Sequence, residues 1–196
     1  GHIVHMPSHI YYRVGRYEDA AKANIAAAAI DEAYIAACNA QGFYPLGYYG
    51  HNIHLLWTSS EMEGNYAASI GAARRLVKAV NAPETAKLFA QAQPFVFTPV
   101  VTQLRFGKYA EVLAEPEPPE ELALDYAVSL YARAFAFANT GDMTQAGVAR
   151  DRLRAFIDKG DQLAAIDAQL IPATLMAELG LELADGEIAR LSGDLQ

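Results

Sequence analysis

The five histidines of this chain lie in two short stretches, and their spacing is its most distinctive chemical feature. His2, His5 and His9 fall within the first ten residues, and His51 and His54 follow near residue 50. In a helix, residues three apart share one face, so His2 pairs with His5 and His51 pairs with His54. Imidazole is the commonest protein ligand for transition metals, because a pKa of about 6.5 leaves it mostly neutral near pH 7.

Two such pairs on neighbouring helices could hold one metal ion, with His9 as a further candidate ligand. Packed helix axes lie ~8–10 Å apart, and side chains from both helices can then reach an ion at the ~2.0–2.1 Å that zinc requires. Three or four nitrogen ligands suit Zn, Cu, Ni or Fe, and the sequence does not select among these metals. The alternative is that the histidines form hydrogen bonds in a groove and bind no metal.

Glycines divide the chain into segments of helical character. Gly15, Gly64, Gly107 and Gly141 each lie between two apolar stretches, and Gly193 begins the same pattern near the end of the chain. A glycine in this position is typical of a helix end at which the chain turns back. The sequence therefore predicts an all-α protein with about nine helices, joined as hairpins, and no sheet.

The repeated unit resembles the tetratricopeptide repeat. Residues 14–20, which read Val-Gly-Arg-Tyr-Glu-Asp-Ala, and the small residue Ala27 carry the likeness. The resemblance implies one helical-repeat domain over residues 1–196, an irregular α-solenoid with a fifth hairpin cut off after Gly193. The turn glycines are 49, 43, 34 and 52 residues apart, and only one interval equals the family period of 34. An ordinary helical bundle with glycine-containing turns is the alternative.

The turn glycines also place the two histidine pairs at equivalent positions. His2 and His51 each lie thirteen residues before a turn glycine, and His5 and His54 each lie ten residues before one. In tetratricopeptide arrays the first helix of each hairpin lines a concave groove, so the resemblance implies that both pairs point into it. The corresponding positions elsewhere give the other predicted groove residues: Tyr12, Arg13, Thr58, Glu61, Phe97, Arg105, Tyr131 and Phe135.

Residues 115–120, which read Glu-Pro-Glu-Pro-Pro-Glu, form the clearest loop of the sequence. They are interpreted as a hinge between two halves, or as the start of the next helix, whose positive N-terminus favours acidic side chains.

The charge balance excludes some partners. Fifteen Lys and Arg stand against 23 Asp and Glu, and a net charge of −8 is unfavourable for binding nucleic acid or an anionic membrane. Residues 33–60 lack charged side chains, but their Asn, Gln, Gly, Pro and His residues argue against a membrane span. The single cysteine, Cys38, excludes an internal disulfide and suits the cytoplasm, while localisation stays open.

Two functions follow from these features. A solenoid offers a long preformed surface, which favours a scaffold that binds a peptide, a partner protein or a small ligand in its groove. The alternative is a transition-metal site, with or without enzymatic activity, built from the His-x-x-His pairs. The unpaired last helix predicts either self-association through the truncated end or a frayed tail after about Asp185.

A second resemblance concerns residues 5–11, 44–49 and 51–54. These stretches resemble a group of larger bacterial tetratricopeptide-like proteins of undefined activity. The resemblance implies that the chain is a piece of a longer protein.

Overall fold

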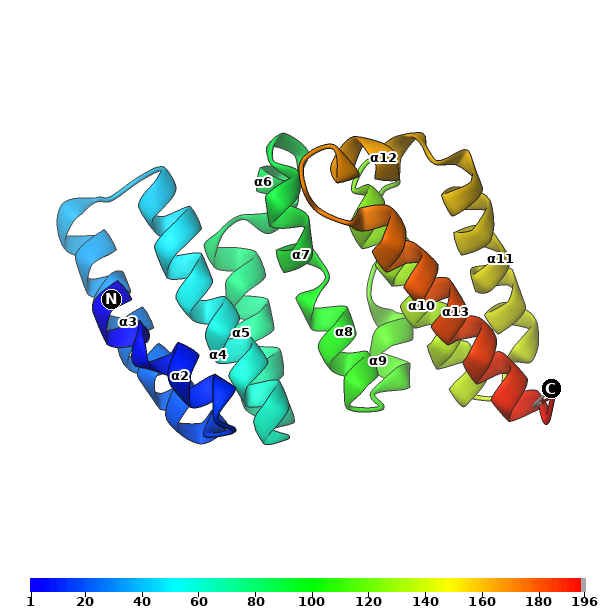
Figure 1. Cartoon of the computed structure of the whole chain (residues 1–196), viewed down its shortest axis with the longest axis horizontal. Helices are drawn as coiled ribbons and strands as arrows, with labels where there is room; N and C mark the ends of the chain where they lie inside the picture. The colour runs from blue at the N-terminus through cyan, green and yellow to red at the C-terminus, as the bar shows by residue number, and fades with distance from the viewer. Residues whose placement is uncertain (195–196) are drawn as a thin grey trace. The chain divides into compact units, whose positions relative to one another are not determined.

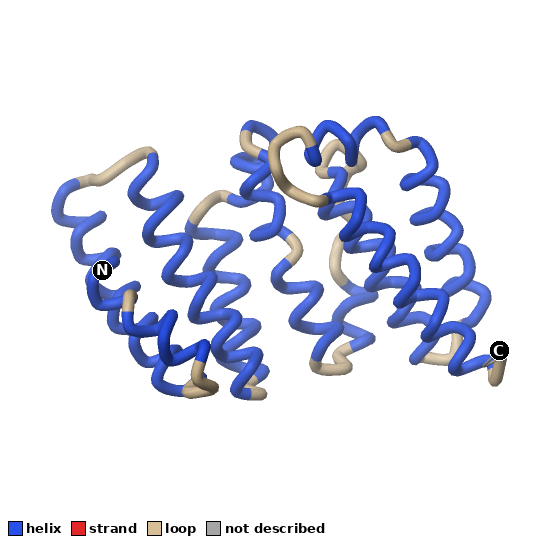
Figure 2. Tube along the Cα trace, in the orientation of Figure 1, coloured by secondary structure: helices blue, strands red, loops and turns tan. Residues whose placement is uncertain are grey.

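The computed structural model describes residues 1–194, and all regular structure in that range is helical (Figure 2). The prediction of an all-α protein without a sheet is therefore confirmed for these residues. Leu195 and Gln196, which the predicted fifth hairpin includes, lie outside the described residues. The chain divides into two compact units, unit 1 (residues 1–82) and unit 2 (residues 83–196).

Unit 1 is organised around one long helix, α3. Its elements are α1 (His2–His5), α2 (Pro7–Arg13), α3 (Tyr17–Cys38), the π-helix η1 (Tyr44–Tyr49), α4 (Gly50–Glu63) and α5 (Tyr66–Ala79). Helix α3 contacts α1, α2, η1 and α4, and α4 packs in turn on α5 (Figure 1). Close packing is possible because small side chains line these faces: Ala20 and Ala27 of α3 and Ala73 of α5 are completely buried.

Unit 2 is built around α10, which contacts most of the other helices of the unit. Its elements are α6 (Ala82–Leu88), the 3-10 helix η2 (Ala90–Ala92), α7 (Gln93–Val96), α8 (Thr98–Arg105), α9 (Tyr109–Ala114), α10 (Ala123–Asn139), α11 (Met143–Lys159), α12 (Asp161–Asp167) and α13 (Ala173–Ser192). Leu124 and Leu130 of α10 and Leu153 of α11 are completely buried in its core. Among the described residues, no helix is long and apolar enough to cross a membrane.

The turn between α4 and α5 shows how the helices of a pair are joined. Gly64 has a φ of 79°, which side chains with a branched Cβ rarely adopt, and the N–H of Asn65 donates to the carbonyl of Ser60 at 3.0 Å. The Asn65 side chain then accepts a hydrogen bond from the N–H of Ala68 and caps α5. Positive φ values are also found at the glycines that follow other helices, which are Gly15, Gly107, Gly141 and Gly193.

The helical segments are shorter and more numerous than the sequence predicts, because prolines interrupt them. Pro7 is the first residue of α2, while Pro94 and Pro99 are the second residues of α7 and α8. Proline has no N–H to donate to the preceding turn, so each of them marks a new helical start. Packing between consecutive helices is common to bundles and solenoids, and the solenoid itself stays a prediction.

The predicted hinge at residues 115–120 is a loop between α9 and α10, inside unit 2. Arg133 of α10 donates to the carbonyl of Glu115, and Arg152 of α11 forms two hydrogen bonds with the carboxylate of Glu117. These contacts attach the loop to both helices. The boundary between the two units falls instead between Ala82 and Pro83. Bending at 115–120 stays a prediction.

Candidate metal centre

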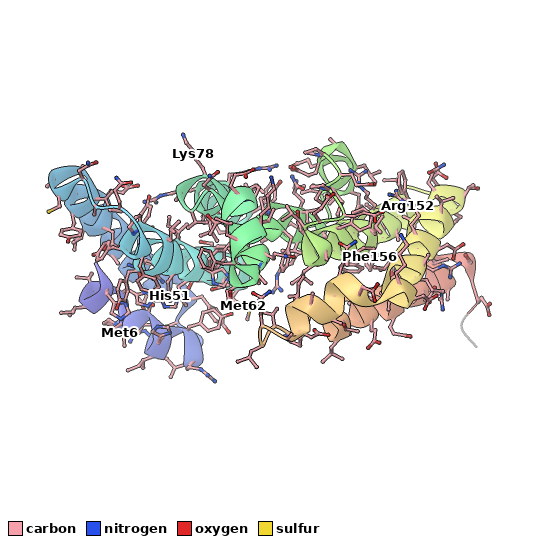
Figure 3. All side chains as sticks on the ribbon, turned by 90° about the horizontal axis from the view of Figure 1, so that it is seen from above. Met6, His51, Met62, Lys78, Arg152 and Phe156 are labelled. Carbon is pink, nitrogen blue, oxygen red and sulfur yellow. The ribbon has the colours of Figure 1, made fainter. Side chains whose placement is uncertain are left out.

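Three helices of unit 1 bring histidines to one place. His5 is the last residue of α1, His9 lies in α2, and His51 lies in the first turn of α4, facing the segment that carries Met6 (Figure 3). The backbone stays helical at Met6, between α1 and α2, so His5 and His9 share one face four residues apart. Helix α4 reaches the same place because it packs on α3 beside α1 and α2.

The imidazoles of His5, His9 and His51, here called the histidine cluster, converge closely. One ring nitrogen from each lies within 4.8 Å of the other two. The ring of His5 lies 4.6 Å from each of the other two rings, and its Nε2 is 2.9 Å from Nε2 of His9. Two nitrogens bound tetrahedrally at ~2.0–2.1 Å are roughly 3.3 Å apart, so a small opening of this pair would admit an ion.

A buried asparagine determines which nitrogen of His5 faces the cluster. Oδ1 of Asn24 lies 2.6 Å from Nδ1 of His5, and Nδ2 of Asn24 donates to the carbonyl of Ala20 at 2.8 Å. Because the amide nitrogen is already used, Oδ1 is the acceptor and Nδ1 of His5 carries the proton. The lone pair of His5 is then on Nε2, as in histidine ligands held by an acceptor on the opposite nitrogen. Sequence reasoning missed Asn24.

Burial keeps His5 and His51 in the protonation state that binds metals. Desolvation, together with smaller contributions from the neighbouring His5 and His9, lowers the pKa of His51 to about 4. Desolvation also lowers the pKa of His5, while the hydrogen bond to Asn24 acts in the opposite direction. Both rings are therefore neutral at pH 7, and neutral imidazole is the form that coordinates metals.

The two remaining histidines lie in different surroundings. The ring of His2 is 5.5 Å from that of His5 and 6.5 Å from that of His51, at the border of the cluster. Its Nδ1 is buried without a hydrogen-bond partner among the described residues. His54 instead stacks on Trp57 at 5.1 Å, and burial lowers its pKa to about 4. The structure thus groups His5, His9 and His51, and not the two predicted His-x-x-His pairs.

A buried carboxylate lies close to the cluster on the α3 side. Asp31 is completely buried and accepts hydrogen bonds from Nδ2 of Asn52 at 2.6 Å and from the hydroxyl of Tyr44 at 2.7 Å. These contacts fix η1 and α4 to α3. The negative charge of Asp31 also acts to raise the pKa of His5, which shows that its field reaches the cluster. Asp31 also forms an ion pair with the amino group of Gly1 at 3.0 Å, so its effect on His5 is the smallest of the contributions to that pKa.

The predicted groove residues are spread over both units. In unit 1, Tyr12 packs its ring against Tyr17, and Thr58 donates to the carbonyl of Leu55 within α4. In unit 2, Phe97 is only 8% exposed and belongs to the hydrophobic core around α10, so it does not line a surface. Of the other predicted groove residues, Arg13 and Arg105 are exposed. The remaining three are partly buried: Glu61, Tyr131 and Phe135.

Comparisons with models of protein families, with characterised proteins and with solved structures found no significant match to this chain. The likeness to tetratricopeptide repeats therefore stays a prediction, and the site is interpreted from its own geometry.

Proposed function

We propose that unit 1 binds a divalent transition-metal ion through Nε2 of His5 and one ring nitrogen each of His9 and His51. The observation that carries this proposal is the convergence of the three nitrogens within 4.8 Å, combined with the hydrogen bond from His5 to Asn24. In the metal-free chain the 2.9 Å contact between Nε2 of His5 and Nε2 of His9 is a hydrogen bond, and a cation at this place would take the position of the shared proton. A bound cation turns that proximity into a favourable interaction.

The ligand set favours an accessible ion over a closed structural one. Structural zinc sites use four protein ligands, whereas sites with three protein ligands keep one position for water or a bound molecule. His9 and His51 are only partly buried, so that position is reachable from solvent. His2 lies beside it and is the residue placed to complete the coordination when no other ligand is bound.

Calorimetric titration of the full chain with Zn(II), Ni(II) and Cu(II) at pH 7.5 tests the proposal. We expect one ion per chain, and His51→Ala should weaken binding at least as much as the roughly 10–100-fold lost when a supporting residue is removed. His54→Ala is the matched control, because His54 lies three residues away on the same helix and outside the cluster. Equal losses in the two variants, or no binding by the unaltered chain, would contradict the proposal.

A second role is favoured by one feature of unit 2. Leu175, Leu179 and Leu183 are exposed and lie at intervals of four residues along α13. Such an apolar stripe is typical of a helix that packs on another helix. We infer that α13 docks a helix of a second copy of the chain through this stripe.

A further inference from the structure

Four aromatic side chains, here called the aromatic patch, form a continuous surface beside the histidine cluster. Tyr34 comes from α3, Phe43 directly precedes η1, and Tyr44 and Tyr48 lie in η1. The ring of Tyr44 is 4.7 Å from that of Tyr34 and 5.6 Å from that of Tyr48, and Phe43 and Tyr48 are 5.7 Å apart. These are the separations at which aromatic rings attract one another.

Hydrogen bonds between η1 and α3 hold the patch in place. The hydroxyl of Tyr44 donates to Asp31, and the hydroxyl of Tyr49 donates to Glu32 at 2.6 Å, so η1 is attached to α3 at two points. Phe43 lies directly over Gly47, where an added Cβ would be 2.8 Å from the ring. Turns of π-helix are frequent at functional sites, and this one presents Tyr48 immediately before the helix that carries His51.

The patch is apolar and yet faces solvent. Phe43 is 74% exposed, and Tyr34 and Tyr48 are also exposed. Residues 33–60 contain no Asp, Glu, Lys or Arg, so the segment that carries the patch presents ring faces and no charged side chain of its own. Exposed ring faces of this kind bind planar groups by stacking.

The patch is continuous with the histidine cluster. The ring of Tyr48 lies 4.9 Å from the ring of His2, which in turn borders His5 and His51. One imidazole therefore separates the patch from the place proposed for the metal ion. A ligand that contacts both must therefore carry its metal-coordinating group close to its ring.

We propose that the aromatic patch binds the aromatic ring of a small molecule whose oxygen donors coordinate the ion held by the histidine cluster. This inference rests on the proposed metal site and adds the class of its ligand. Tyr48 and Phe43 supply the stacking contacts, and the ion supplies the polar contact that fixes the orientation of the molecule. His2 moves away from the coordination position that the donors then occupy.

Two hydroxamates that differ only in one ring test this inference. Benzohydroxamate and acetohydroxamate carry the same chelating group, and calorimetry of the Zn(II)-loaded full chain compares their affinities. We expect benzohydroxamate to bind about tenfold more tightly, and Phe43→Ala and Tyr48→Ala to bring the ratio close to one. Phe89→Ala is the control, because Phe89 is an exposed phenylalanine of unit 2 outside the patch.

Each outcome of this experiment is informative. Equal affinities of the two hydroxamates for a chain that has taken up zinc overturn the aromatic site and leave the metal site intact. A chain that takes up no zinc overturns both proposals. A dimer that becomes monomeric in Phe43→Ala would show that the patch is covered by a second copy, which also overturns the inference. Circular dichroism verifies that the variants keep their helix content.

Discussion

Nδ1 of His5 and Oδ1 of Asn24 lie 2.6 Å apart, although 19 positions separate the two residues in the chain. Both side chains are completely buried, so a water molecule cannot take the place of either hydrogen-bonding partner. The contact joins α1 to α3 and at the same time turns Nε2 of His5 toward His9. The packing of unit 1 and the geometry of the histidine cluster therefore depend on the same hydrogen bond.

Replacing Asn24 by leucine should affect both stability and metal binding. Asn24→Leu removes the closer acceptor for Nδ1 of His5 and should cost about 1–3 kcal/mol in the free energy of unfolding, because the buried donor keeps only the long 3.4 Å contact to the hydroxyl of Ser8. It should also weaken metal binding by about 10–100-fold, because the His5 ring is no longer oriented. Asn24→Asp keeps an acceptor and should retain most of the affinity. Denaturant unfolding and calorimetry measure the two effects, and an unchanged affinity in Asn24→Leu would contradict this role.

The stability of unit 1 should fall in mild acid. His51 and His54 have pKa values of about 4 in the folded chain, against about 6.5 when unfolded, so the unfolded chain binds more protons between these values. The free energy of unfolding should therefore decrease as the pH falls from about 6.5 to 4, and stay nearly constant above 6.5. Fluorescence of Trp57, the only tryptophan, reports on this unit. A stability that rises as the pH falls through this window would contradict the assignment.

Unit 2 should show the opposite dependence because of one buried acid. Burial raises the pKa of Asp125 to about 7 from an ordinary value of 3.8. The folded chain then binds more protons than the unfolded chain between these values, so unit 2 should lose stability as the pH rises toward 7. Hydrogen exchange of peptides from α10 measures this, and Asp125→Asn should remove the dependence. The same slope in Asp125→Asn would assign it to another group.

The leucine stripe of α13 should mediate self-association. Leu179→Glu places a charge in the middle of the stripe and should convert a dimer to a monomer, because a desolvated charge opposes apolar contact. Val148→Glu on α11 is the control, since Val148 is also an exposed apolar residue. Light scattering measures the oligomeric state, under reducing conditions because Cys38 is exposed. A monomeric unaltered chain would argue against the docking role.

The helix ends at the turn glycines could be located from the sequence because they depend on local chemistry. Gly64 supplies a left-handed backbone, and Asn65 supplies a side-chain cap for the next helix. Both effects act within a few residues, so the pattern of glycines between apolar stretches is sufficient to locate them.

The membership of the histidine cluster could not be located in the same way. It depends on how the helices are rotated about their axes relative to one another, and a count of residues along each helix does not give that rotation. Counting residues back from the turn glycines therefore pairs His5 with His54, whereas the structure brings His5 to His51.

The supporting residues carried a signal that the sequence analysis did not use. Asn24 and Asp31 lie seven residues apart on the face of α3 that is otherwise lined by Ala20, Ala27 and Ala28. Polar residues at helical spacing within a stripe of buried alanines require partners inside the protein. Their partners are His5 for Asn24, and Tyr44 and Asn52 for Asp31.

Anomalous diffraction from crystals of the Zn(II)-loaded chain tests the metal centre most directly. The account predicts one strong peak in the anomalous map, about 2.0–2.1 Å from Nε2 of His5 and from one nitrogen each of His9 and His51. His54 should still be stacked on Trp57 and make no contact with the ion. A peak bound by His54 in place of His51, or no peak near His5, would contradict the proposal that these three histidines form the metal site.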